Sequence, residues 1–493
     1  MTARGAIALP SARDGFHLRV PARARSLLAG ALARAAFVTL AALAALLVLL
    51  AASGSSFLTP TTGPLYFPSW MAGPLGGVWS RGPISEQALH WEVSAILAGM
   101  YLAYLMTILL SARVRARWVL ATVLAVHLVF LLAPPLQYTD VFNYINYARM
   151  GVVHHLDPYG TIPMLEPHAD PTFTLSNWHW LLSPYGPLFT LATYALVPLG
   201  VPGSFWAIKV LVCASSLGML ALVWRCALLL GRDPVKAIAL VGLNPIVLMW
   251  GLGADHNDVL MVAPMVLCVY LLLRARVTAP TAAPAVGRLR YEHLAAAALI
   301  AAVGVKASAA VLIPVAFVAA PHRRAFAVGL VLAAAAMSLA SVVAFGAHLP
   351  GLGIQTSLVT DVGPANLLGW SLGQGGETAT LHTILGIAAG LIVLLSAIRA
   401  GRAGKDWLAL AGVSLLAVWL TTSWFTPWYL IWILPFAALA ARPRLTICVL
   451  AIGVYLLVAF GPEITPLLQA LHFNPNGSPL GQKHYHQNIT LAR

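Results

Sequence analysis

The chain has 493 residues, of which 60% are apolar and only 9% are charged. A soluble domain carries about 25% charged residues, so this composition excludes an ordinary soluble protein. The formal net charge of +14 does not indicate a nucleic-acid partner, because the basic residues lie in short clusters between apolar runs, as in the cytoplasmic loops of membrane proteins. We therefore expect an all-α polytopic integral membrane protein in a lipid bilayer.

Many apolar runs between residues 36 and 460 reach the length of about 20 residues that a helix needs to cross a bilayer. They predict a bundle of about 11–13 transmembrane helices. The first run, 36–52, is interpreted as a span and not as a removed signal peptide, because no small-residue cleavage site follows it. The further expected spans are 91–110, 118–136, 205–230, 237–254, 259–273, 325–345, 384–398, 407–424, 429–440 and 445–460.

Two stretches are compatible with more than one membrane topology. The run 188–200 is apolar but short, and we interpret it as a re-entrant segment, because two crossings would place the basic residues Arg232 and Lys236 outside. Residues 294–320 hold Lys306 at their middle and lie between two basic clusters, so they predict a hairpin of two short helices that meet near Lys306. A Pro/Ala linker precedes this hairpin at 278–287.

The basic residues orient the bundle. Clusters between the spans hold all but a few of the 29 Lys and Arg residues. The exceptions are Arg81, Arg149, Lys209, Lys306, Lys483 and Arg493. Since such clusters favour the cytoplasmic side, the N-terminal segment 1–35 is expected in the cytoplasm. The loops expected outside are 53–90, 137–186, 254–258 and 348–381, with the tail 461–493. We expect a multi-pass plasma-membrane protein whose polar site faces the extracytoplasmic side.

The four cysteines indicate neither a disulfide framework nor a metal site. All of them lie inside apolar runs, where we expect small core residues. They are Cys213, Cys226, Cys268 and Cys448.

The stretch 138–149 supplies the first candidate site. It follows the span 118–136 directly and contains Asp140 with three tyrosines, two asparagines and Arg149. A carboxylate just past a span lies at the lipid–water boundary, where partial desolvation suits a general base. The structural alternative is that Asp140 caps a helix end or pairs with Arg149. Three tyrosines of this external segment are expected to bind substrate: Tyr144, Tyr159 and Tyr185.

The second candidate site is Asp255-His256-Asn257-Asp258, at the end of an apolar run that contains Asn244-Pro245. We expect His256, Asn257 and Asp258 to hold sugar hydroxyls. Carboxylate and imidazole groups also bind divalent cations, so a metal site is an alternative, but the spacing does not favour it. A polar turn that caps the next helix is the structural alternative.

Lys306 is the third candidate. An ammonium group among apolar residues needs an anionic partner or a water-filled cavity. A phosphate group is one such partner, and an ion pair with Asp140 or Asp258 is the structural alternative.

Trp428 and Tyr429 form the fourth candidate, together with Trp424 and Trp432. Aromatic belts at the membrane interface explain such residues by default. Sugar rings also stack on aromatic faces, so these residues are equally expected to line a substrate pocket.

Taken in order, these motifs resemble a known family. They are Tyr138-Thr139-Asp140-x-Phe142-x-Tyr144, Asp157-Pro158-Tyr159, Ser183-Pro184-Tyr185-Gly186-Pro187-Leu188, Asn244-Pro245 with His256-Asn257-Asp258, the lone Lys306, and Pro427-Trp428-Tyr429-x-x-Trp432. Over residues 118–440 the chain resembles the actinobacterial polyprenol-phosphate-mannose-dependent α-(1,6)-mannosyltransferases of the GT-C superfamily. Those enzymes extend the α-1,6-mannan cores of lipomannan and related cell-envelope glycans.

The resemblance implies a GT-C-like bundle with external catalytic loops, a polyprenyl-phosphate-linked sugar donor, and a glycan or glycolipid acceptor. The superfamily's catalytic base lies in the first long external loop, at the position of Asp140. Members often carry a second acid beside it, but the neighbours here are Thr139 and Val141. A metal-dependent variant is therefore not favoured, and no cofactor is expected.

For such a glycosyltransferase we expect a single displacement at the anomeric carbon, and one base with no obligatory nucleophile indicates inversion. Asp140 would take the proton of the acceptor hydroxyl, and Lys306 with Arg149 would stabilise the charge on the departing phosphate. Mannose is inferred from the resemblance alone, and arabinose and glucose stay open.

A transporter or flippase for lipid-linked sugars is the alternative function. It also predicts polar residues in a polytopic bundle, but it adds internal repeats and broken helices at the bilayer midplane. The sequence has no convincing repeat, and most polar clusters lie at external ends of spans, which favours an enzyme open to one compartment. Lys306 is the residue that most favours the transporter.

Overall fold

The computed structural model describes residues 22–53, 57–59, 68–79, 82, 84–278, 290–351, 353, 358–402 and 406–481. Within these ranges the regular secondary structure is helical throughout, which confirms the all-α prediction. Of the linker expected at 278–287, Thr278 ends helix α9, and residues 279–287 lie outside the described residues. So do residues 1–21 of the N-terminal segment and residues 482–493 of the tail.

Six helical stretches of the described chain are long and apolar enough to cross a membrane, or up to eight if each of two bent pairs counts as one span. The six belong to α1 (Ala22–Ala52), α3 (Glu86–Leu110), α6 with α7 (Pro187–Tyr194 and Gly200–Leu229), α9 (Asp258–Thr278), α12 (Arg323–Phe345) and α15 (Ala379–Ala400). The bent pairs are α8 (Pro234–Gly242) with η5 (Val247–Gly253), and α18 (Arg444–Ala459) with α19 (Ile464–Ala470). These helices confirm a multi-pass membrane protein.

Five further apolar helices have 10–17 residues. They are Ala116–Leu131, Tyr291–Val305, Ala307–Ala319, Trp407–Thr421 and Pro427–Leu439. The expected number of 11–13 spans requires these shorter helices to cross the bilayer as well, and it stays a prediction.

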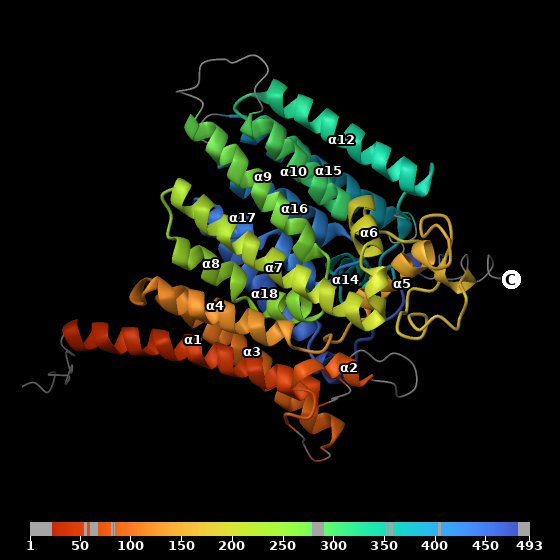
Figure 1. The fold of residues 1–493 in the computed structure, drawn as a ribbon. Helices are drawn as coiled ribbons and strands as arrows, with labels where there is room; N and C mark the ends of the chain where they lie inside the picture. Colours follow the sequence, from red (N-terminus) through yellow and green to blue (C-terminus); the bar gives the residue numbers. More distant parts are fainter. Residues whose placement is uncertain are drawn as a thin grey trace, which may run out of the picture.

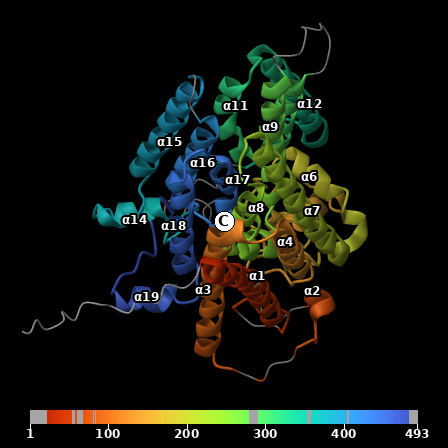
Figure 2. The same cartoon turned by 90° about the vertical axis from the view of Figure 1, so that its left-hand side faces the viewer.

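The long helices lie roughly alongside one another, and the short helices α5 (Asp140–Val152), α6 and α14 (Pro364–Ser371) gather toward one end of the bundle (Figure 1). Helices α1 and α3 pack on each other, and α1 also packs on α4 (Ala116–Leu131), so they form a layer at one edge. At the opposite edge lies α12, packed on α10. In the turned view, α14, α15, α18 and α19 lie together on a third side (Figure 2).

Two of the long helices contribute little to the buried core. Only 17% of the apolar window of α12 and 22% of that of α15 is buried within the protein. Helix α12 exposes leucine and valine side chains, and α15 exposes leucine and isoleucine side chains. A large exposed apolar surface marks contact with another apolar phase, so these two helices present surfaces suited to lipid.

The segment around Lys306 forms two short helices, as the sequence predicted. Helix α10 (Tyr291–Val305) ends at Lys306, whose backbone is extended (φ −154°, ψ 128°), and η6 (Ala307–Leu312) with α11 (Ile313–Ala319) follows. The chain returns toward the end of α9, where Arg276 donates a hydrogen bond to the Ala319 carbonyl over 2.7 Å. The ammonium of Lys306 therefore lies at the break between two helices and not in the middle of one.

The apolar run at 188–200 forms α6 and the single turn η4 (Val197–Leu199), which lead directly into α7. These three elements count as one helical stretch from Pro187 to Leu229, so the short run makes no separate crossing. Helix α6 packs on α5 and α10, which places it beside the polar end of the bundle.

The run before Asp255 forms a seven-residue π-helix, η5. The side chain of Asn244 accepts hydrogen bonds from the amides of Ile246 and Val247, at 3.0 and 3.3 Å, at the start of this turn. Asp255 then adopts the left-handed region (φ 57°). π-Helical turns are rare and frequently occur at functional sites, and this one delivers residues 255–258 to the polar end of the bundle.

Candidate active site

A polar pocket lies where α5, the start of α9, the break at Lys306 and η7 (Pro427–Trp432) meet. Its lining residues are Asp140, Tyr144, Tyr147, Trp178, Leu181, Pro184, Tyr185, His256, Asn257, Asp258, Lys306, Leu358, Trp424, Trp428 and Tyr429. The sequence-predicted residues in this set come from five separate segments of the chain, and the fold brings them together.

Asp140 is the first residue of α5 and faces the pocket. The N-terminus of a helix favours a negative charge because its free N–H groups and its dipole are positive. The carboxylate is 16% exposed, and its Oδ2 lies 3.5 Å from Nε2 of His256. Arg149 does not pair with it, because Arg149 binds Asp170 instead. Asp140 thus lines the pocket without a Lys or Arg partner among the described residues.

Asp258 is the first residue of α9 and is fully buried. Lys306 Nζ lies 2.9 Å from both of its carboxylate oxygens, and Trp432 Nε1 donates a hydrogen bond to Oδ1 over 2.7 Å. The ammonium also lies 4.4 Å from the centre of the Tyr429 ring. The structural alternative for Lys306, an ion pair with Asp258, is therefore present in this structure.

Asp255 does not line the pocket. Its carboxylate lies 3.2 and 3.3 Å from Nζ of Lys209 on α7, and both side chains are at most 2% exposed. The two acids of residues 255–258 thus each have a lysine partner. Within the described residues, no group of three or more His, Cys, Asp or Glu side chains is arranged to hold a metal ion.

His256 and Asn257 are buried and face the pocket. The Asn257 backbone amide donates a hydrogen bond to the Tyr144 hydroxyl over 3.2 Å, which ties the start of α9 to α5. The Asn257 amide nitrogen Nδ2 has no hydrogen-bond partner in the described part of the chain. A buried polar atom that is left free in a pocket is suited to bind a substrate hydroxyl.

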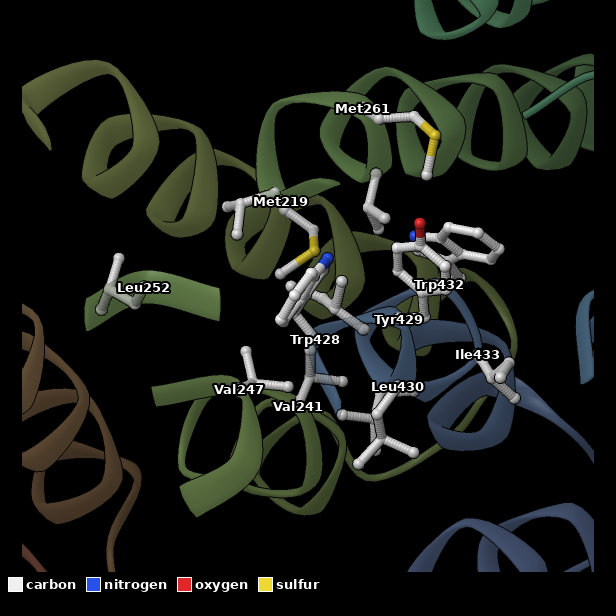
Figure 3. Packing of buried hydrophobic residues seen from close by; sticks show 14 of the residues in the cluster. Met219, Val241, Val247, Leu252, Met261, Trp428, Tyr429, Leu430, Trp432 and Ile433 are labelled. Atoms are coloured by element: carbon white, nitrogen blue, oxygen red, sulfur yellow. The ribbon is translucent and has the colours of Figure 1, made fainter. Parts of the chain in front are cut away.

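The aromatic residues of η7 are buried side chains of the site, not an interfacial belt. Trp428 stacks on the His256 ring with 3.7 Å between ring centres, and Tyr429 stacks on Trp432 at 4.0 Å. All three η7 rings are at most 8% exposed. Figure 3 shows them within the buried cluster, with Met261 of α9 nearby. Trp428 and Tyr429 therefore line the pocket.

Arg149 and Tyr159 lie outside the lining of this pocket. Arg149 donates hydrogen bonds to both oxygens of Asp170 over 2.8–3.0 Å, and His154 contacts the same carboxylate at 2.7 Å. The Tyr159 hydroxyl donates to the Tyr185 carbonyl over 2.8 Å. Both residues hold the segment 153–186 on the bundle, and neither faces the substrate space.

Two acids of the loop between α5 and α6 have opposite environments. Burial by itself raises the pKa of Asp170, but hydrogen bonds from Arg149, Thr172 and His154 outweigh it and hold that pKa well below its ordinary value. Burial raises the pKa of Glu166 to about 7, and the nearby Asn146 amide opposes this shift only in part.

Trp178 is a pocket residue that the sequence did not reveal. Its ring meets that of Trp424 edge to face at 5.6 Å, which closes one side of the pocket. Asn143 on α5 positions it, because its side-chain oxygen accepts hydrogen bonds from the amides of Asn177 and Trp178 at 3.1 and 3.2 Å. Asparagine within the Asp140 helix was a signal for such a contact. The other lining residues not predicted are Tyr147, Leu181, Pro184 and Leu358.

Comparison with known proteins identifies a family. Residues 38–320 match the family profile described as alpha-(1->6)-mannopyranosyltransferase, N-terminal domain, and residues 359–472 match the MptB C-terminal domain. No solved structure matches the chain.

Two curated relatives extend over most of the chain. Alpha-(1->6)-mannopyranosyltransferase A of Mycobacterium tuberculosis is 31% identical over 368 residues, which cover 68% of this chain and 67% of the relative. A probable alpha-(1->6)-mannopyranosyltransferase of Mycolicibacterium smegmatis is 28% identical over 381 residues, which cover 67% and 66%. The family profile, the curated relatives and the residues of the pocket agree that the chain belongs to the α-(1→6)-mannopyranosyltransferase family.

Proposed function

We propose that the chain transfers mannose from polyprenyl phosphate to a hydroxyl of a cell-envelope glycan or glycolipid. The reaction takes place on the extracytoplasmic face and inverts the anomeric carbon, with Asp140 as the general base. Membership of a mannosyltransferase family supports the reaction class. The assignment of the base rests on one observation: which of the carboxylates that line the pocket is already paired with a cation.

Asp140 is the pocket carboxylate that is free to take a proton. Asp258 also lines the pocket, but Lys306 neutralises it at 2.9 Å. Two further acids of the loops, Asp157 and Asp361, do not line the pocket. A general base must reach the proton it removes, and Asp140 meets this requirement, since it faces the pocket and has no cation beside it.

An apolar cavity next to the pocket supports a lipid-linked donor. It has a volume of about 430 Å³, lies between α6, α10 and α12, and shares Pro184 with the polar pocket. Its walls include Gly186, Gly304 and Ser341, and its outer helix α12 is the least buried of the long helices. An isoprenoid chain would enter from the bilayer past α12, with its phosphate directed to Lys306.

The charge distribution supports the extracytoplasmic side. Asp140 and Asp258 begin helices at the pocket end of the bundle, whereas Arg276 and Ala319 meet at the far ends of α9 and α11. The basic clusters at that far end favour the cytoplasm. A donor carried by a lipid can reach an external site without any soluble nucleotide sugar.

Proteoliposomes test this proposal. Purified protein is reconstituted with radiolabelled polyprenyl-phosphate mannose and an α-1,6-linked mannose oligosaccharide as the acceptor. We expect an α-linked product from a β-linked donor and loss of lipid-bound label. Label that crosses the bilayer without reaching the acceptor would instead identify a flippase.

Asp140→Asn is the matched variant for the base. The amide keeps the shape of the side chain but takes no proton, so the transfer rate should fall about 10²–10⁴-fold while the melting temperature stays near that of the wild type. A variant that turns over donor at the wild-type rate would exclude Asp140 as the base.

A further inference from the structure

The His256 ring is held in one orientation from three sides. Its Nδ1 lies 2.5 Å from the Trp250 carbonyl oxygen at the π-helical turn. One ring face stacks on Trp428 at 3.7 Å with an interplanar angle of 15°, and Tyr138 packs edge to face at 5.8 Å. The side chain is 1% exposed. Packing of this kind prevents the ring from turning within the site.

This orientation fixes the tautomer of the neutral ring. A carbonyl oxygen only accepts hydrogen bonds, so Nδ1 carries the hydrogen and Nε2 carries the lone pair. Nε2 points toward Asp140, with 3.5 Å to Oδ2. It is buried and has no hydrogen-bond partner among the described residues. The lone pair of a nitrogen and a carboxylate oxygen thus face each other, and one proton between them would complete a hydrogen bond.

We propose that His256 is a positioning residue that accepts, at Nε2, a hydrogen bond from the proton that Asp140 removes from the acceptor. The proposal rests on Asp140 as the base of the proposed function. The acceptor oxygen forms the bond to the anomeric carbon, and the bond from that carbon to the phosphate oxygen breaks with its electron pair. The hydroxyl proton passes to Asp140 and is then shared with His256.

The exposed fractions of the two side chains indicate that Asp140, and not His256, meets the acceptor first. Asp140 is 16% exposed and meets the substrate space, whereas Nε2 of His256 is buried behind it. The sequence had predicted that His256 holds a sugar hydroxyl directly. His256 does line the pocket, but its Nε2 is directed at the Asp140 carboxylate over 3.5 Å, and this direction favours the indirect role.

The other charged groups around this pair are already neutralised. Asp255 is paired with Lys209, and Asp258 with Lys306. The remaining titratable neighbours of Asp140 include the buried tyrosines Tyr138 and Tyr144, along with Tyr147, Tyr185 and Tyr429. A phenol keeps its proton near neutral pH. Among the described residues, the imidazole nitrogen is therefore the one group near Asp140 that is both free and basic.

A double-mutant cycle tests the coupling. Single and double variants of Asp140→Asn and His256→Phe are assayed for transfer in the proteoliposomes described above. Phenylalanine keeps a ring to stack on Trp428 but has no nitrogen. We expect His256→Phe to lower kcat about 10–100-fold with little change in the KM of the donor. In the Asp140→Asn background the same substitution should have no further effect, because residues that act through one another are not additive.

Two further variants separate this role from a structural one. His256→Gln offers an amide oxygen to the same proton and should keep more kcat than His256→Phe. It also replaces His256→Phe in the cycle if the latter does not fold. His127→Phe is the matched control, because His127 is another buried histidine whose Nδ1 contacts a backbone carbonyl, but its Nε2 contacts Ser216 and no carboxylate. It should keep kcat near the wild-type value.

The outcomes distinguish the proposal that Asp140 is the base from the proposal that His256 acts through Asp140. Loss of activity in Asp140→Asn, with an equal loss from His256→Phe in both backgrounds, would overturn the coupling and leave the base intact. A raised KM with unchanged kcat would show that His256 binds the sugar directly. Wild-type activity in Asp140→Asn would instead overturn the proposed base, and this inference with it.

Discussion

The ammonium of Lys306 is paired with Asp258, and this pairing determines what its removal should do. Lys306→Met would leave a buried carboxylate without its cation, so we expect a loss of about 3–5 kcal/mol in the free energy of unfolding. Adding Asp258→Asn should restore part of that loss, because no uncompensated charge then remains. Thermal melting in detergent measures both effects.

The same melting experiment tests the role of Lys306 toward phosphate. Wild-type protein should gain stability from polyprenyl phosphate, because a ligand that binds only the folded state stabilises it. The double variant should lose that gain. A double variant that the lipid still stabilises fully would rule out Lys306 as the phosphate ligand.

Glu166 predicts a pH dependence of stability. An unfolded glutamate titrates near 4.5, and burial raises the pKa to about 7 in the folded protein. Between these values the folded state binds more protons than the unfolded state, so stability should fall as pH rises from 4.5 to 7. Glu166→Gln should therefore melt higher than wild type at pH 8, and this difference should shrink toward pH 4.5.

The control for this measurement is Glu86→Gln, at an exposed carboxylate on α3. It should show no comparable difference between pH 4.5 and pH 8. If the difference in melting temperature between Glu166→Gln and wild type were the same at every pH from 4.5 to 8, Glu166 would not be buried in solution.

At the scale of elements, α6 and α10 approach each other at two glycines. A Cβ on Gly186 would lie 2.3 Å from the Gly304 carbonyl oxygen, which is backbone and cannot give way by a side-chain rotation. The Gly186 amide also donates to the Val305 carbonyl over 3.0 Å, directly beside Lys306. Gly186→Ala should therefore separate the two helices, lower the melting temperature and slow transfer.

Gly218→Ala is the matched control for the packing of α6 on α10. Gly218 lies inside α7, and no atom is within 4 Å of its added Cβ. Alanine is favoured over glycine in a helix by about 1 kcal/mol, so this variant should be as stable as wild type or more so. Equal stability losses in both variants would contradict the close contact of α6 and α10.

The sequence predicted elements well where one charge interrupts an apolar run. The helix break at Lys306 follows from the penalty for an ammonium group in apolar surroundings. The π-helix before Asp255 could not be predicted, because its hydrogen-bond shift depends on packing against distant helices. The Lys209–Asp255 pair joins residues 46 positions apart in sequence, so only the fold reveals it.

In the candidate site, too, some residues could be predicted from the sequence and others could not. Asp140, His256 and Lys306 could be identified because ionisable residues within apolar runs or at their ends are rare. Arg149 was misplaced because its partner Asp170 lies in an irregular loop, where the sequence carries no periodic signal. Trp178 was missed for the same reason, although Asn143 holds it in place.

At the scale of the whole molecule, the prediction concerns the side of the membrane on which the pocket opens. The two ends of α15 allow a direct test, because Ala379 and Arg402 are exposed and lie at or near its opposite ends. In intact cells, a membrane-impermeant maleimide should label Ala379→Cys and not Arg402→Cys. Cys448→Ala removes the native thiol that is not fully buried. The reverse labelling pattern would place the pocket in the cytoplasm.

The exposed surface of α12 has a consequence for how the reaction is measured. The proposed lipid-linked donor, entering past this helix, would diffuse in two dimensions. Its mole fraction within the bilayer would then set the encounter rate, and its molarity in the assay volume would not. Dilution of the donor with inert phospholipid lowers turnover even when the number of donor molecules in the tube is constant. The fluidity of the surrounding membrane would thereby become a kinetic variable of the proposed reaction.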